Sequence, residues 1–182
     1  LLIFQQLGCW KGSNIAFIGG LGAGGGGVSV STSDACIECG LKLPPLSSET
    51  RKKLANILGE VGSILRNPID VSQALLRDPS SILPAIELIA EDPAVELLLI
   101  QEDAGILFSY FPWKEAEGIN DFLIDFGSRH DKPLVIVLPP GSGELKRLDI
   151  EQRLLKAGVP VFPTVERAAK AIVRINKYFS SK

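Results

Sequence analysis

Solidly apolar runs alternate along this chain with longer segments in which apolar residues recur every three or four positions. A solid run is typical of a strand that is buried on both faces, as in a parallel sheet. The expected strands cover residues 15–18, 41–43, 95–100, 134–138 and 159–162; Lys42, Glu96 and Pro160 interrupt the second, third and last of them, and the other two are solidly apolar. The periodic segments are typical of amphipathic helices. The pattern therefore predicts an open parallel sheet with a layer of helices on each face.

The segments between the strands carry residues that favour helix ends. Ser47 would cap the start of one helix, and Gly40 would follow the end of another. The predicted helices cover residues 28–39, 47–58, 81–90, 114–126, 144–157 and 165–179. Pro68 disfavours the helical conformation of the residue before it, so residues 66–71 are expected to form an irregular loop. Residues 1–13 are expected to be a linker or the tail of a helix from an upstream domain.

Residues 14–182 are predicted to form one α/β domain, because the chain has 182 residues of which 46% are hydrophobic, enough for one two-sided core. The order of the elements favours a three-layer, flavodoxin-like sheet with the strand order 2-1-3-4-5. In such a sheet, ligands bind beyond the carboxyl ends of the strands, between the first and the third strand. The candidate chemistry is therefore expected where the first strand ends.

Composition and charge narrow the classes of partner. The 19 basic and 21 acidic residues give a net charge of −2, which provides no basic surface for nucleic acid. Acidic residues interrupt the most apolar region, residues 82–100, so no membrane span is expected. An odd number of cysteines, three, and the lack of a signal-peptide pattern favour a reduced, cytoplasmic location. The absence of Met is expected of a piece of a longer chain.

A glycine-rich stretch, residues 19–27, follows the first predicted strand directly. Seven of its nine residues are Gly. Glycine lets backbone amides approach a ligand closely, and the amino end of a helix favours an anion, so the stretch predicts a phosphate cradle. The groups expected to form this cradle belong to Gly24, Gly25, Gly26, Gly27, Val28, Ser29, Ser31 and Thr32. A tight strand-to-helix turn without a ligand is the alternative.

Two common nucleotide-binding motifs do not fit this stretch. The pattern G-x-G-x-x-G is present, but the acidic residue that a dinucleotide site needs about twenty positions later is replaced by residues 41–45, which contain no carboxylate. No Gly-Lys-Ser/Thr follows, which excludes a P-loop. The stretch therefore predicts an anion site of another kind.

Two further loops offer polar side chains that would support this site. Asn67 and Asp70 flank Pro68, which would hold an amide and a carboxylate at fixed positions; an Asx turn that satisfies its own backbone is the alternative. Glu102 and Asp103 follow the third strand and are expected beside the glycine-rich stretch. Paired carboxylates there suit metal binding or proton transfer, and a solvated loop is the alternative.

The remaining residues of catalytic type favour structural roles. Cys36 and Cys39 have C-x-x-C spacing but lie on the predicted core stripe of their helix, so core packing is favoured over redox chemistry. His130, the only histidine, is expected to be a solvated helix-end residue at the opposite edge of the sheet. No metal site and no Ser-His-Asp arrangement is predicted. The aromatic residues within 108–113 are expected either to form a partner surface or to pack against the sheet.

Four segments, taken in order, carry a resemblance to a known family. They are residues 24–30, 34–46, 66–70 and 158–171. In this order they resemble the carboxyl-terminal flavodoxin-like domain of NDP-forming acyl-CoA synthetases, the relatives of succinyl-CoA synthetase and of ADP-forming acetyl-CoA synthetase. The resemblance covers nearly the whole chain from about residue 11.

The resemblance implies a phosphoryl relay. In the family, acyl-CoA and phosphate give an acyl phosphate, which phosphorylates a histidine on a mobile loop, and the group then passes to a nucleoside diphosphate. Residues 24–32 match the helix whose amino end faces that phosphohistidine. CoA, Mg²⁺ and the nucleotide are expected for the complete enzyme and not for this domain alone.

This chain departs from the family in what it lacks. It shows no phosphohistidine segment, no CoA-binding Rossmann domain and no ATP-grasp domain, so no catalytic residue is assigned to it. A CoA-binding domain with the phosphohistidine and an ATP-grasp domain are the expected partners, in the same longer chain or as subunits. Two alternatives stay open: a non-catalytic assembly module that uses residues 110–113, and a small nucleotide- or flavin-binding protein.

Overall fold

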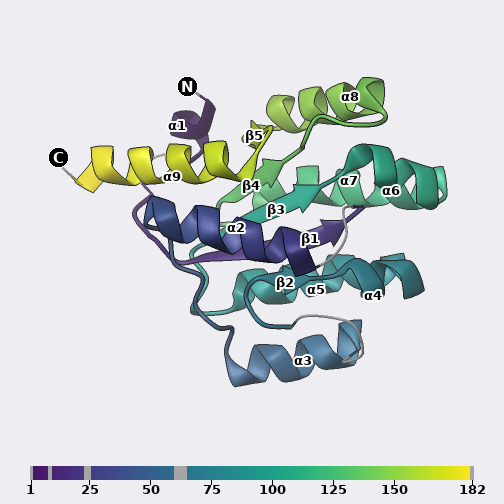
Figure 1. The fold of residues 1–182 in the computed structure, drawn as a ribbon, viewed down its shortest axis with the longest axis horizontal. Coiled ribbons are helices and arrows are strands. Elements are labelled where there is room, and N and C mark those ends of the chain that lie inside the picture. Colours follow the sequence, from purple (N-terminus) through teal and green to yellow (C-terminus); the bar gives the residue numbers. More distant parts are fainter. Residues whose placement is uncertain (1, 8–9, 23–25, 60–64, 181–182) are drawn as a thin grey trace.

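A parallel sheet forms the centre of the molecule. The computed structural model describes residues 2–7, 10–22, 26–59 and 65–180. These residues form a five-stranded sheet in the order β2-β1-β3-β4-β5, with every neighbouring pair of strands parallel (Figure 1). The strands are β1 (Ile15–Leu21), β2 (Ile69–Asp70), β3 (Leu97–Glu102), β4 (Leu134–Val137) and β5 (Val161–Phe162). The predicted flavodoxin-like class and strand order are confirmed.

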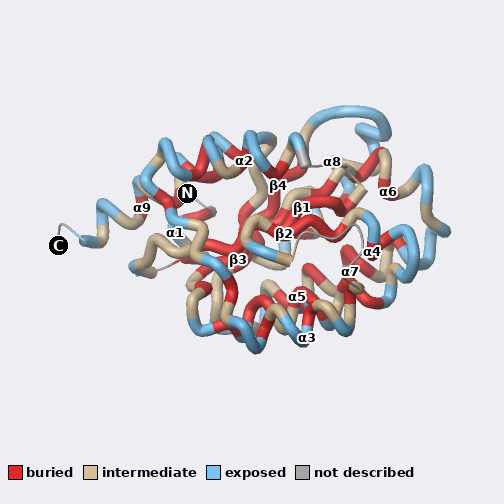
Figure 2. The backbone as a smooth tube through the Cα atoms, turned by 60° about the horizontal axis from the view of Figure 1, so that its bottom comes forward, coloured by how far each residue is buried: buried red, intermediate tan, exposed pale blue. Residues whose placement is uncertain are grey.

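Helices cover both faces of this sheet, which gives three layers. One layer consists of α1 (Leu2–Leu7), α2 (Gly26–Cys39) and α9 (Val165–Ser180). The other face is covered by α3 (Ser48–Leu58), α4 (Ser72–Arg77), η1 (Pro79–Ser81), α5 (Ile82–Glu91), α6 (Ala104–Tyr110), α7 (Trp113–Arg129) and α8 (Glu144–Lys156). Figure 2 shows the buried strands between α2 and α9 on one side and α3, α5 and α7 on the other.

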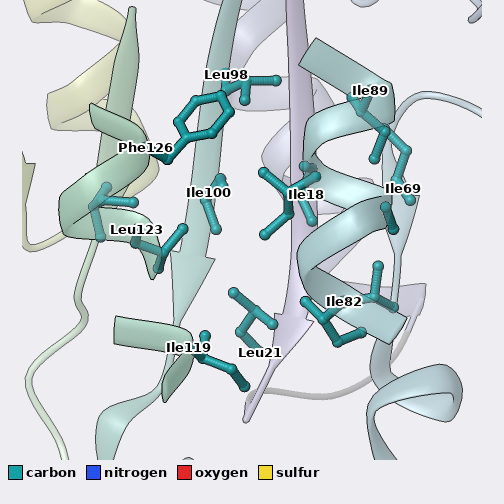
Figure 3. Close-up of a cluster of buried hydrophobic side chains, with 14 of the residues drawn as sticks. Ile18, Leu21, Ile69, Ile82, Ile89, Leu98, Ile100, Ile119, Leu123 and Phe126 are labelled. Atoms are coloured by element: carbon teal, nitrogen blue, oxygen red, sulfur yellow. The ribbon is translucent and has the colours of Figure 1, made fainter. Parts of the chain in front are cut away.

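The solid apolar runs of the strands explain why the core has two halves. Successive side chains of a strand point to opposite faces, so every residue of a central strand is buried against one helical layer or the other. Phe17 and Leu99 pack toward α2 and α9, whereas Ile18 and Ile100 pack toward α5 and α7. Figure 3 shows the second half, in which Ile18 and Ile100 lie between side chains of α5 and α7.

The prediction of a second strand over residues 41–43 is wrong. This segment makes only an isolated bridge, between Asn14 and Lys42, and the second strand comes instead from residues 66–71, which were expected to be a loop. The two prolines that follow residue 43 provide no backbone donor and so cannot continue a ladder. The amide of Asn67 takes their place, because its Oδ1 accepts from the Phe17 amide (3.0 Å) and its Nδ2 donates to the Ile15 carbonyl (2.6 Å).

The amino-terminal helix packs against the end of the chain. The ring of Phe4 on α1 lies 5.2 Å from the ring of Tyr178 and 5.7 Å from that of Phe179, both on α9. Ile3 and Leu7 join the core half beneath α9. A helix, one of the two expected alternatives for this segment, is therefore present, and it belongs to the core half beneath α9. Its origin in an upstream domain stays a prediction.

Among the described helices, none combines the length and the apolar character that crossing a lipid bilayer requires.

Candidate functional site

The glycine-rich stretch leaves the sheet at the carboxyl end of β1. Gly19 and Gly20 still belong to this strand, and Leu21 pairs with Glu102 at the end of β3. The expectation that the stretch leaves the sheet beside Glu102 is therefore confirmed at the end of β1. Gly24 and Gly25, two residues of the predicted cradle, lie outside the described residues. Helix α2 begins at Gly26.

Two residues without side chains begin α2. Gly26 and Gly27 open this 14-residue helix, and its first turn contains no acidic residue. A Cβ added at Gly27 would meet nothing within 4 Å, so this side of the turn is open. The first amides of a helix have no acceptor within the helix, and they carry the positive end of its dipole. The turn can therefore donate hydrogen bonds to an anion that approaches from this side.

The hydroxyl groups that follow are engaged or buried within the protein. The Oγ of Ser31 donates to the Val28 carbonyl (3.1 Å), and the side chains of Ser29 and Thr32 are buried. Ser31 and Thr32 line a groove of about 290 Å³ that is also lined by Glu166. A hydrogen bond from Thr164 lowers the pKa of Glu166. A carboxylate held in its charged form disfavours an anion here. The amides at residues 26–28, which have no acceptor within the helix, are the stronger part of the predicted cradle, and the role of all eight predicted residues stays a prediction.

The structure separates the two residues that were expected to support the site. The amide of Asn67 is fully engaged with backbone groups near the amino end of β1 and also donates to the Pro44 carbonyl (3.0 Å). Asp70 lies at the carboxyl end of β2, where its Oδ1 accepts from the Ser72 amide (2.9 Å). A Cβ at Gly20 would lie 2.7 Å from that oxygen. Asp70 thus borders the exit of β1, and Asn67 does not.

The expected alternative of a solvated loop at residues 102–103 is wrong. Glu102 is the last residue of β3 and is fully buried, while Asp103 caps α6 by accepting from the Ile106 amide (3.0 Å). Burial raises the pKa of Glu102 to about 7; a hydrogen bond from Asn120 opposes this rise, and the charges of Asp103 and Glu117 add to it. The site therefore contains a carboxyl group poised near neutrality.

Asn120 is a site residue that the sequence analysis missed. Its Nδ2 lies 3.2 Å from Oε1 of Glu102 and also donates to the Ala116 carbonyl (3.1 Å). The signal was an amide in the middle of the apolar stripe of α7, between the buried residues Ala116, Ile119 and Leu123. A buried polar group of this kind needs a partner on the facing element, and here that partner is the end of β3.

The cysteines and the histidine have structural places. Cys36 is buried in the core half beneath α2, which confirms core packing for this residue, and Cys39 packs half-buried against the same half. Burial raises the pKa of the Cys36 thiol to about 12. His130 follows the end of α7 as expected, but it is half-buried: its ring stacks on Phe126 (4.4 Å between centroids) and its Nδ1 accepts from the Lys132 amide (3.0 Å). Within the described residues, no three His, Cys, Asp or Glu side chains gather as a metal site would require.

The aromatic segment before α7 is divided between packing and exposure. Phe108 packs edge-on against Trp113, with 5.1 Å between the ring centroids. Tyr110 and Trp113 are 74% and 63% exposed, and Leu76 on α4 is 61% exposed. Leu76 and Tyr110 border an apolar groove of about 260 Å³ that reaches Gly20 and Gly22. Both expected roles of this segment thus have support in its geometry.

Comparisons with known proteins identify solved structures of similar fold. No family model and no curated protein matches the chain. Among solved structures, PH0766 from Pyrococcus horikoshii OT3 is similar with a TM-score of 0.71 and 22% identity, over 92% of this chain and 36% of that one. The apo dinucleotide-forming acetyl-coenzyme A synthetase 1 of Ca. Korarchaeum cryptofilum is similar with a TM-score of 0.64 and 18% identity, over 94% of this chain and 36% of that one.

A structure of the same Korarchaeum synthetase in complex with phosphate and ADP gives the same TM-score of 0.64 and identity of 18%, over 94% of this chain and 35% of that one. At these identities the likeness establishes the fold. The resemblance expected from the sequence is confirmed at that level, and the chain spans about a third of the length of the proteins it matches.

Proposed function

We propose that this chain is a phosphate-docking domain of an NDP-forming acyl-CoA synthetase, and that the amino end of α2 receives the phosphohistidine of another domain. The complete enzyme would join an acid to CoA while a nucleoside triphosphate is converted to the diphosphate and phosphate. The observation that carries the proposal is the glycine-rich start of α2 at the carboxyl end of β1, next to β3.

The physical basis is the match between a dianion and free amides. A phosphoryl group on histidine carries negative charge that must be stabilised away from bulk water. The turn at residues 26–28 offers backbone donors and the positive end of the dipole of α2, and the open side at Gly27 leaves room for the group to approach. This domain would thus hold and orient the phosphoryl group, and the reacting side chain would come from elsewhere.

The other parts of the reaction are assigned to partner domains. CoA, Mg²⁺ and the nucleotide would bind to a CoA-binding domain and an ATP-grasp domain, in the same longer chain or as subunits. The Korarchaeum synthetase, similar to this chain over about a third of its length, has a structure with phosphate and ADP, which are ligands of the proposed reaction. This supports the assignment without identifying the acid.

Titration with inorganic phosphate tests the cradle directly. In amide NMR spectra of the labelled protein, saturable shifts are expected for residues 24–32, and added sodium chloride should weaken them because the contact is electrostatic. Shifts that spare residues 19–33 would refute the cradle.

Two glycine variants separate binding from folding. Gly27→Val places a side chain in the open space in front of the turn, and Gly141→Val adds the same side chain at another glycine whose Cβ would also meet nothing within 4 Å. The first variant is expected to lose the phosphate shifts, and the second to keep them. If all three proteins are folded and bind phosphate equally, the proposal is contradicted.

A second function is favoured by the exposed aromatic residues. Tyr110 and Trp113 border α6 and α7, where they would suit a non-catalytic module that holds partner subunits together. Native mass spectrometry with an ATP-grasp partner distinguishes the two: tight association that Tyr110→Ala weakens, together with no response to phosphate, favours assembly. Phosphate shifts at residues 24–32 favour docking.

A further inference from the structure

Near the end of β3, two buried side-chain oxygen atoms have no hydrogen-bond partner among the described residues. Asn120 on α7 donates from Nδ2 to Oε1 of Glu102 (3.2 Å) and to the carbonyl of Ala116 (3.1 Å). The second oxygen of each of the paired side chains, Oε2 of Glu102 and Oδ1 of Asn120, is buried and lacks a hydrogen-bond partner among the described residues. Besides these two atoms, only Nε of Arg51 is in that condition within the described part of the chain.

Donor counting explains what the pair lacks. A carboxamide has two N–H donors, and both hydrogens of Asn120 are directed at acceptors, which fixes the orientation of its amide. Its Oδ1 is therefore an acceptor, and Oε2 of an ionised Glu102 is an acceptor as well. Two buried acceptors cannot bond to each other, and leaving each one unpaired is unfavourable by an amount comparable to a lost hydrogen bond. One proton on Oε2 converts this oxygen into a donor.

We propose that Glu102 is a neutral carboxylic acid in the folded protein, bonded reciprocally to the Asn120 amide, and that this pair is a proton-dependent latch between β3 and α7. In the latched state the amide donates from Nδ2 to Oε1, and the acid donates from Oε2 to Oδ1. Deprotonation releases the proton to water and leaves a carboxylate that the amide bonds on one side only.

The charges around the pair favour the neutral acid. Asp103 follows Glu102 in the chain, and Glu117 lies on α7 within electrostatic reach; both are acidic. The nearby cations are engaged by Glu117, which forms ion pairs with Lys146 and Arg153 of α8. On β1, the residue paired with Glu102 is Leu21, which is apolar. Burial also raises the pKa of Glu102 to about 7, so the neutral form persists to the physiological range.

The latch lies where the candidate site begins. The Asp103 amide donates to the Leu21 carbonyl (2.8 Å), and a Cβ at Gly22 would lie 2.4 Å from the Asp103 carbonyl oxygen. The backbone that leaves β1 toward the glycine-rich stretch is thus packed against the residue that follows Glu102. A change in the charge of Glu102 acts on the segment that holds the start of this stretch.

Direct titration of the side chain tests the proposal. In the ¹³C-labelled protein, the carboxyl carbon of Glu102 is assigned through its own backbone and followed from pH 4 to pH 9. A midpoint near 7 is expected. A midpoint in the ordinary range of glutamate, near 4.5, would overturn the proposal, and this measurement needs no variant.

Glu102→Gln supplies a second, independent readout. A glutamine amide can donate to Oδ1 and accept from Nδ2, so it reproduces the latched acid without a titrating proton. A raised pKa in the folded state means that stability is fully present below the unfolded pKa and is lost as the pH rises through the folded pKa. The unfolding constant of the natural chain, divided by that of Glu102→Gln, is therefore expected to rise about tenfold per pH unit from about pH 4.5 to pH 7.

A matched control separates this behaviour from a general effect of removing an acid. Glu96 directly precedes β3, but its Oε2 accepts from the amides of Ser13 (2.9 Å) and Asn14 (2.8 Å), so it has the partners that Oε2 of Glu102 lacks. Glu96→Gln is expected to raise the unfolding constant at pH 8 at least tenfold, whereas Glu102→Gln should lower it. If both variants raise it at pH 8, the latch is refuted.

Discussion

The two edges of the sheet treat buried polar groups in opposite ways. At the amino edge, two polar side chains each have several partners: Glu96 accepts from two amides, and Asn67 exchanges hydrogen bonds with the backbone of β1. At the carboxyl edge, Glu102 and Asn120 share one hydrogen bond and keep two oxygen atoms without partners. The contrast suggests that the amino edge was shaped for stability and the carboxyl edge for function.

The pKa values of two acids, one at each edge, express the same contrast. Burial alone would raise the pKa of Asp92 before β3, but hydrogen bonds from Thr50, the Ala94 amide and Ser47 outweigh burial, and the pKa is lowered. For Glu102, burial prevails and the pKa is raised to about 7. Asp92 is thus favoured as a carboxylate, whereas Glu102 keeps its proton up to about pH 7.

The amino edge is expected to give the largest loss of stability. Asp92→Ala removes the acceptor of the Ser47 amide (2.8 Å) and of the Ala94 amide (2.9 Å), which are left without this partner. The free energy of unfolding at pH 7 should fall by about 3 kcal/mol, as measured by urea denaturation. Because the pKa of Asp92 is lowered, its stabilisation is present above the ordinary value of 3.8 and is lost as the pH falls through the lower folded value.

The neighbouring acid provides the control for this prediction. Glu91 is exposed at the end of α5, and Glu91→Ala should change the free energy of unfolding by less than about 0.5 kcal/mol. If Asp92→Ala lowers the free energy of unfolding as little as Glu91→Ala does, the proposed difference between the two edges is wrong.

A single methyl group added at the carboxyl edge is expected to destabilise the protein. A Cβ at Gly105, near the start of α6, would lie 1.9 Å from the Ser142 carbonyl oxygen, which is backbone and has little room to move. Gly105→Ala is expected to lower the free energy of unfolding by about 2 kcal/mol because the segment before α8 must shift. Thermal unfolding followed by circular dichroism measures this.

Gly118→Ala is the matched control on α7. A Cβ there would meet nothing within 4 Å, and alanine favours a helix interior over glycine, so a gain of about 0.5–1 kcal/mol is expected. If Gly105→Ala also stabilises the protein, the close approach of α6 to residues 142–143 is incorrect.

The strands of the sheet centre could be predicted from sequence because their signal is strong and local. Residues 97–100, directly after Glu96, and residues 134–138 are apolar without interruption, and both regions contain the expected strand. The second strand could not be found in this way, because β2 has two residues, one of them Asp70, and follows a segment whose pairing is made by the side chain of Asn67. The longer segment 41–43, in which Lys42 lies between two leucines, competed for the same place and makes only an isolated bridge.

The candidate site could be predicted in position but not in chemistry. The run of glycines is enough to predict where the chain leaves β1. The position of Glu102 beside it is predicted because this residue ends the third strand. Its burial depends on which face of α7 meets β3, and that is settled by the packing of Ala116, Ile119 and Leu123 around Asn120. Periodicity indicates that a helix has an apolar stripe, but it does not identify the strand that the stripe covers.

The smallest changes in the free energy of unfolding are expected for the exposed aromatic residues at the carboxyl edge. They distinguish a ring that packs within the fold from one that is available to a partner. The ring of Trp113 lies 3.9 Å below the Lys146 Nζ and packs on Phe108, so Trp113→Ala should lower the free energy of unfolding by about 1 kcal/mol. Tyr110 is more exposed than Trp113, and Tyr110→Ala should change the free energy of unfolding by less than about 0.5 kcal/mol in urea denaturation. A cost at Tyr110 equal to that at Trp113 would mean that both rings serve the fold. The expected difference leaves Tyr110 as an aromatic side chain that folding does not require, which is the property of a residue retained for contact with another domain.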